Sequence, residues 1–168
     1  SDAANQPLPA PWDGYTLSHP DVRAAYLNYC RRIIDFFQPD YFAVGIEGNL
    51  LRANAPAAWP AYVELHRYVY AQLKAAYPAL PIFVSFTGMD LVIGWTSTNH
   101  AEQMAALADV IGYTDYFGLS IHPQGSVCML HRNPAAVPSV ADFRTLFALG
   151  GKPVAVCETS YPAEPFTV

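Results

Sequence analysis

Two glutamates in this 168-residue chain each follow directly on a short apolar run with the composition of a buried strand. Glu47 comes after "YFAVGI" and Glu158 after "VAVC". A single glutamate at such a point is more often the first polar residue after a strand than a catalyst. Two carboxylates together can hydrolyse a glycosidic bond, because one protonates the glycosidic oxygen while the other attacks the anomeric carbon or activates water. We therefore take Glu47 and Glu158 as the candidate catalytic pair.

These two runs belong to a pattern of apolar strands that alternate with amphipathic helices. Strands are expected to start near residues 41, 81, 115 and 153, and helices are expected over 18–37, 57–77, 99–113 and 139–149. Residues 1–17 are expected to be an irregular lead-in, and 18–168 the folded domain. Four such repeats predict right-handed βαβ units, a parallel sheet and the α/β class.

Local signals refine three of these elements. Ser18 stands three residues before Asp21 and is expected to cap the first helix, as Asn99 is expected to cap the third. The run 41–46 is apolar throughout, which is typical of a core strand buried on both faces.

The α/β class leaves two architectures, an open doubly wound sheet and part of a (β/α)8 barrel. In both of them functional groups collect beyond the carboxyl ends of the strands. The side chains found there are Glu47 with Asn49; Ser85 with Thr87 and Asp90; His122; and Glu158 with Tyr161. None of the turns carries GxGxxG or GxxxxGK[ST], which counts against a dinucleotide or nucleotide site and favours the barrel.

Three segments resemble a known family. "QPDYFAVGIEGNLL" looks like the fourth strand, "TDYFGLSIHP" like the sixth and "KPVAVCETSYPAE" like the seventh strand of retaining glycoside hydrolases built on (β/α)8 barrels, most nearly the endo-β-1,4-galactanase (arabinogalactanase) type. The similarity extends over roughly residues 19–164. It implies that Glu47 is the general acid/base and Glu158 the nucleophile.

The same resemblance implies roles for three neighbours of the pair. His122 would contact the sugar or orient the nucleophile, Asn49 would hydrogen-bond near the acid, and Tyr161 would support the turn after the nucleophile. The chain departs from the family at Ile46, where the family usually has an asparagine.

The second departure is that the segments correspond to strands four to seven alone. The resemblance therefore implies a partial TIM barrel of about four parallel βα units. Such a sheet has two open edges, so we expect self-association or a complementary fragment to complete the barrel.

Other reactive side chains give weaker alternatives. His122 has no second histidine or carboxylate at i+2 to i+4, so no metal site is predicted, and no cofactor is expected. Cys157 should point away from Glu158 and pack beneath the helices, because side chains alternate along a strand. A serine nucleophile would require a GxSxG turn, which the chain lacks.

Two further residues are candidate substrate contacts. Trp95, in a loop that contains Gly94, is the better candidate for a sugar-stacking platform, whereas Trp59 is expected in the core. Asp90 either binds substrate or caps the segment that follows it. The remaining histidines are assigned by default to surface or helix positions: His66, His100 and His131.

Bulk composition excludes some classes of partner. A net charge of −5 with nine scattered Lys and Arg residues argues against nucleic acid, and no apolar run is long enough for a membrane span. Three distant cysteines show no metal-type pairing. Either the chain is cytoplasmic or a signal has been removed, and we slightly favour a secreted or periplasmic location.

Two functional classes remain open at this point. One is a retaining glycosidase, or a fragment of one, that degrades a β-linked polysaccharide such as galactan. The other is a non-catalytic carbohydrate-binding or scaffold member of the same fold.

Overall fold

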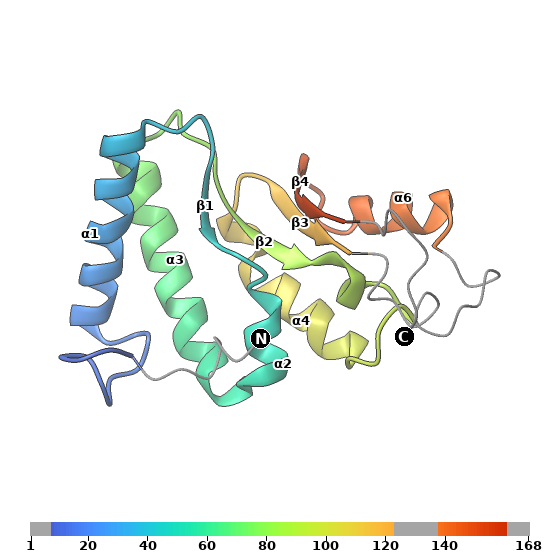
Figure 1. Ribbon diagram of the computed structural model, residues 1–168, viewed down its shortest axis with the longest axis horizontal. Helices are drawn as coiled ribbons and strands as arrows, with labels where there is room; N and C mark the ends of the chain where they lie inside the picture. The colour runs from blue at the N-terminus through green and yellow to red at the C-terminus, as the bar shows by residue number, and fades with distance from the viewer. Residues whose placement is uncertain (1–7, 123–137, 161–168) are drawn as a thin grey trace.

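The computed structural model describes residues 8–122 and 138–160. Tyr161, Cys128 and His131 lie outside the described residues. Within them the chain forms four parallel strands joined by helices, which confirms the α/β class (Figure 1).

The four strands form one sheet in sequential order, β1-β2-β3-β4, and every neighbouring pair is parallel. Their bounds are Phe42–Gly45 for β1, Ile82–Thr87 for β2, Phe117–Ile121 for β3 and Val154–Thr159 for β4. Each strand starts within two residues of the position expected from the sequence. The order contains no reversal of direction, unlike a doubly wound sheet, in which the strand order reverses at a switch point.

Four longer helices match the predicted ones. They are α1 (Pro20–Phe37), α3 (Trp59–Ala76), α4 (His100–Val110) and α6 (Val140–Ala148). Two short helices that the sequence pattern did not indicate are α2 (Asn49–Asn54) and the 3-10 turn η3 (Gly88–Leu91). The 3-10 turns η2 (Pro56–Ala58) and η4 (Ile111–Tyr113) lie at the start of the predicted helix 57–77 and at the end of the predicted helix 99–113. No helix in the described ranges is long and apolar enough to cross a membrane.

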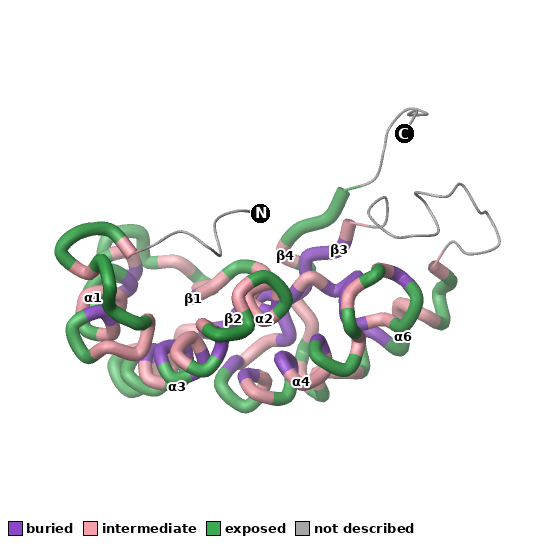
Figure 2. Tube along the Cα trace, turned by 90° about the horizontal axis from the view of Figure 1, so that it is seen from below, coloured by how far each residue is buried: buried purple, intermediate pink, exposed green. Residues whose placement is uncertain are grey.

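The longer helices lie on one side of the sheet (Figure 2). Right-handed crossovers between strands in sequential order place every connecting helix on the same face, so the topology accounts for this arrangement. Within the described residues, the opposite face of the sheet has no helix packed on it.

The core lies between the sheet and these helices. In its larger cluster, Val84 and Phe86 of β2 and Leu119 of β3 pack with Leu107 of α4 and Leu146 of α6. A second cluster joins β1 and the start of β2 to α1 and α3. Because side chains alternate, Ser85 and Thr87 of β2 and Ser120 of β3 point to the face without helices.

The two outer strands are less buried than their apolar sequences suggested. In β1 only Val44 is buried, so the expectation of a core strand buried on both faces is wrong. In β4 no residue is fully buried, and Val156 is 51% exposed. Both strands lie at the edges of the described sheet, where one flank has no neighbour to cover it.

The helix caps agree with the sequence in part. Asn99 caps α4 by accepting hydrogen bonds from the amides of Ala101 and Glu102, as predicted. The expected Ser18 cap is wrong, since α1 begins one residue later and the His19 ring accepts from the Asp21 amide at 3.3 Å.

Candidate functional site

The candidate site lies at the carboxyl ends of the strands, where Glu47, His122 and Glu158 come together. One ligand-type atom from each residue, a carboxylate oxygen or a ring nitrogen, lies within 4.8 Å of the other two. Glu47 follows β1 and Glu158 is in β4, at opposite edges of the sheet. Three steps of about 4.8 Å would separate these strands by roughly 14 Å, so both side chains must reach inward over β2 and β3.

Glu47 occupies an unusual backbone conformation just beyond β1. Its φ is +50°, in the left-handed region that costs a residue with a side chain roughly 1–2 kcal/mol. Two hydrogen bonds to Ser85 hold the chain there. The Glu47 amide donates to Ser85 Oγ at 2.9 Å, and the Gly48 amide donates to the Ser85 carbonyl at 2.9 Å.

Glycine at position 48 is required by close packing. A Cβ built on Gly48 would lie 2.8 Å from Tyr62 Oη and 3.2 Å from a methyl of Val84. Tyr62 lies between His66, whose ring is stacked with it, and Trp59, whose ring is tilted against it, so it has little room to move. The segment that carries Glu47 is therefore pressed against α3 and β2.

Glu158 reaches the site because β4 contains a bulge. In the β3–β4 pairing Leu119 lies opposite Val156 and Ser120 lies opposite Glu158, which leaves Cys157 as the extra residue. If β4 kept the same residues and paired without a bulge, Glu158 would share the face of Val156, the face on which Leu119 contacts the helices. The bulge turns Glu158 to the face without helices, where its side chain is 48% exposed.

Cys157 is this bulge residue and is half-buried, so it does not belong to the core beneath the helices. Its Sγ donates to the Ala155 carbonyl at 3.5 Å. Burial raises the pKa of the Cys157 thiol, which disfavours the thiolate that a nucleophile requires.

His122 links the end of β3 to the end of β4. Its Nδ1 lies 2.7 Å from Ser160 Oγ, within hydrogen-bonding distance, and its Nε2 lies 3.7 Å from Glu158 Oε2. The ring is 37% exposed. The ring is therefore held at Nδ1 by Ser160, and its Nε2 faces the Glu158 carboxylate.

The same three side chains form the one group of potential metal ligands found among the described residues. The sequence showed no metal pattern because the donors come from three different strand ends. Ligand atoms around a tetrahedral zinc at about 2.1 Å would be roughly 3.4 Å apart, so the widest pair, at up to 4.8 Å, would have to close to hold that ion.

Three predicted substrate contacts are buried away from solvent. Asn49 is 0% exposed, accepts from the Thr87 amide at 2.8 Å and donates to Gln103 Oε1 at 2.7 Å. Asp90 is 5% exposed and accepts from the Thr98 hydroxyl at 2.9 Å. We therefore assign Asn49 and Asp90 to the support of the strand-end loops, which corrects the expectation that they bind substrate.

Trp95 is also not a sugar platform. It is 6% exposed and packs edge-on against Phe143 with ring centroids 5.3 Å apart, so it belongs to the core. Trp59 is buried as expected. His66, assigned by default to a surface or helix position, is a buried residue of α3.

Sequence reasoning missed the roles of Ser85 and Ser160. Both serines lie close to strand ends. Nothing in the sequence around Ser85 indicates that it contacts the Glu47 amide, and nothing around Ser160 indicates that it contacts the His122 ring.

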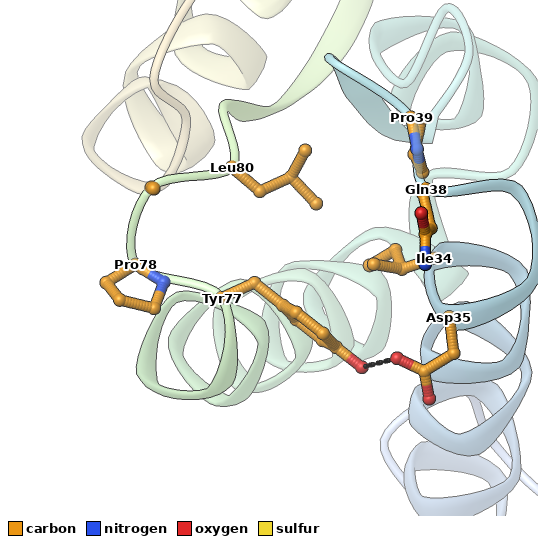
Figure 3. Close-up of a pocket in the computed structure, with 8 residues that line it drawn as sticks. Ile34, Asp35, Gln38, Pro39, Tyr77, Pro78 and Leu80 are labelled. Carbon is orange, nitrogen blue, oxygen red and sulfur yellow. Dashed lines mark hydrogen bonds between the residues drawn. The ribbon is translucent and has the colours of Figure 1, made fainter.

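An open pocket of about 440 Å³ lies elsewhere, between the carboxyl end of α1 and the turn before β2. There Tyr77 Oη donates to Asp35 at 2.7 Å (Figure 3). This pocket adjoins the amino ends of β1 and β2, the end of the sheet opposite the glutamates.

Fold and site together define an α/β protein that brings two carboxylates and an imidazole together at the carboxyl end of a parallel sheet. No protein-family model matches the sequence, and no curated protein matches it.

Proposed function

We propose that this chain is part of a retaining glycoside hydrolase. The observation that carries the proposal is the approach of Glu47 and Glu158, whose oxygens lie within 4.8 Å although they come from opposite edges of the sheet. Retaining enzymes hold their two carboxyl groups about 5–5.5 Å apart, whereas inverting enzymes leave roughly 6.5–9.5 Å for a water molecule. The short separation favours retention.

The proposed reaction has two displacements. The Glu158 carboxylate attacks the anomeric carbon while Glu47 donates a proton to the departing glycosidic oxygen, so the carbon–oxygen bond breaks and a glycosyl-enzyme ester forms. Glu47 then takes a proton from water, the water oxygen attacks the anomeric carbon, and the Glu158 carboxylate leaves. His122, 3.7 Å from Glu158, orients the nucleophile.

We further propose that the four strands are half of a (β/α)8 barrel. Sequential order and helices on a single face are what consecutive units of such a barrel require. Large apolar side chains are exposed near the β1 edge: Tyr41, Ile46, Phe36 and Phe37. Val156 is exposed at the β4 edge. Neighbouring βα units, from a complementary fragment or a second copy, would cover these side chains.

The substrate that we propose is a β-linked polysaccharide such as galactan. This choice rests on the resemblance of the β1, β3 and β4 segments to the endo-β-1,4-galactanase type. The half-exposed Glu158 and His122 side chains are compatible with a site open to a polymer.

Hydrolysis of 4-nitrophenyl β-glycosides by wild type and two variants tests the proposal. Glu158→Gln should lower kcat by a factor of about 10³ or more, because no ester can form. Glu47→Ala should lose less with this good leaving group, and azide should restore turnover with a β-glycosyl azide as product. Glu64→Gln, an exposed glutamate on α3, is the matched control.

Two results would refute the hydrolase. One is an active wild-type enzyme whose turnover is unchanged by Glu158→Gln, and the other is an initial product of inverted configuration. A 2-fluoro-glycoside that labels Glu158, detected by mass spectrometry of the peptide, would identify the nucleophile directly. Circular dichroism checks that the variants are folded.

A non-catalytic carbohydrate-binding role is the second candidate. It is favoured by Ile46, which is 56% exposed and stands where the related family usually places an amide that contacts the sugar. This alternative predicts that galactan binds to wild type and Glu158→Gln with equal affinity while neither releases sugar, which affinity electrophoresis and reducing-end assays would show.

A further inference from the structure

We propose that Ser85 is a positioning residue for Glu47, a role that rests on the proposed hydrolase function. Ser85 is fully buried in β2 and contacts the peptide groups on both sides of the Glu47 Cα. Its hydroxyl accepts from one amide and its carbonyl accepts from the next. A single residue thus fixes two consecutive peptide groups at the base of the proposed acid/base.

The Ser85 hydroxyl binds the chain just beyond the end of the β1–β2 ladder. Ladder pairing stops at Gly45 opposite Val84, after a register shift between Ala43 and Gly45. Beyond that point the chain turns into the left-handed conformation of Glu47. A left-handed residue with a side chain persists only when its surroundings hold it, and the Glu47 amide is held by Ser85 Oγ at 2.9 Å.

The chain is fixed again immediately after Glu47. Gly48 fits against Tyr62 with no room for a side chain, and Asn49 exchanges hydrogen bonds with the amide and carbonyl of Thr87. Ser85 and Thr87 lie on the same face of β2, so two alternate residues of one central strand bracket Glu47. The Glu47 backbone is therefore tied to β2, while its side chain reaches toward Glu158 of β4.

This arrangement has a consequence for the reaction. The distance between the Glu47 and Glu158 carboxylates depends on the backbone angle at Glu47, which Ser85 sets. A displacement of about 1 Å in a catalytic group can lower the rate by about 10²-fold. Loss of the Ser85 hydroxyl should therefore lower kcat and leave binding of the sugar nearly unchanged.

Ser85→Ala tests the proposal against a matched control. Thr114 is also fully buried, and its hydroxyl accepts from the Val84 amide of the same strand at 3.3 Å without touching Glu47. We expect Ser85→Ala to lower kcat by about 10- to 100-fold with KM within about threefold. Thr114→Val should keep the wild-type kcat, and Ser85→Thr, which retains the hydroxyl, should recover most of the activity.

A structural readout separates this inference from the proposed function. The crystal structure of Ser85→Ala should show Glu47 outside the left-handed region and its carboxylate moved relative to Glu158. In the unaltered protein, the Glu47 amide should be protected from hydrogen exchange, which tests the contact even if Ser85→Ala does not fold. A wild-type protein inactive on every β-glycoside would refute the proposed hydrolase function. The crystal structure and the hydrogen-exchange measurement would still test whether Ser85 holds the Glu47 backbone.

Three outcomes would overturn the role of Ser85. They are a wild-type kcat in Ser85→Ala, an unchanged Glu47 backbone in its crystal structure, or an equal loss of kcat in Thr114→Val. The last result would show that destabilisation of β2, rather than the position of Glu47, limits the rate.

Discussion

His66 should make the protein lose stability in mild acid. The ring is buried in α3, lies between Tyr62 and Tyr70 at centroid distances of 6.0 and 6.5 Å, and its Nε2 is 2.8 Å from the Tyr113 carbonyl. Burial lowers the pKa of His66 from 6.5 to about 4, and nearby Arg67 acts in the same direction. The His66 ring therefore binds a proton near pH 6.5 in the unfolded chain, whereas in the folded protein it binds one only near pH 4.

The sign and size of the effect follow from that difference in pKa. Between pH 6.5 and 4 the unfolded state carries more protons, so the free energy of unfolding falls as the pH falls. Proton linkage gives a loss of about 2 kcal/mol between pH 7 and 5 and about 3 kcal/mol by pH 4. Above pH 7 this contribution is complete and constant.

Urea unfolding at pH 5, 6, 7 and 8 measures the effect in wild type and His66→Gln. Glutamine can still donate to the Tyr113 carbonyl but does not titrate, so the variant should have a flatter pH dependence whatever its absolute stability. Contributions from carboxylates are common to both proteins and cancel in the comparison. Parallel losses of stability in the two proteins would refute the reasoning.

Two further predictions concern the site itself. Gly48→Ala should destabilise the protein by about 1–3 kcal/mol in thermal or urea unfolding, since its Cβ would meet Tyr62 Oη at 2.8 Å. Addition of Tyr62→Phe to Gly48→Ala should restore much of the lost stability, because it removes the oxygen that the Cβ would meet. Gly112→Ala should cost little stability, since nothing lies within 4 Å of a Cβ at that position. Equal losses of stability in Gly48→Ala, in the double variant and in Gly112→Ala would contradict the role of packing at Gly48. Activity should survive dialysis against EDTA, because two carboxylates suffice for the proposed reaction, whereas a loss restored by a divalent cation would give Glu47, His122 and Glu158 a metal-binding role.

The positions of the strands could be predicted because the hydrophobic pattern is strong. Each run is apolar and bounded by helix-breaking or polar residues, and parallel strands bring their carboxyl ends to one edge. That rule placed Glu47, His122 and Glu158 at this edge within a larger set of strand-end residues, and the structure brings these three side chains together. The outer strands were the exception, since an apolar run does not reveal whether a partner covers both of its flanks.

The inward-facing residues of the strand-end loops could not be predicted. Asn49, Asp90 and Trp95 were expected to face substrate, but their side chains fill or stabilise the loops on which they lie. Polar groups in short helices such as α2 and η3 must satisfy buried backbone atoms, and sequence does not say which of them do so. The left-handed Glu47 and the Cys157 bulge also depend on pairing between strands far apart in the chain.

The bulge in β4 allows the strand to lose one residue without a change in the direction of Glu158. A chain without Cys157 would pair regularly, with Val156 opposite Leu119 and the glutamate next to it opposite Ser120. A relative shortened there by one position would therefore show a gap in an alignment and still direct its glutamate to the face without helices. A β4 of unchanged length that pairs without a bulge would keep every residue in the alignment and turn the same glutamate toward the helices.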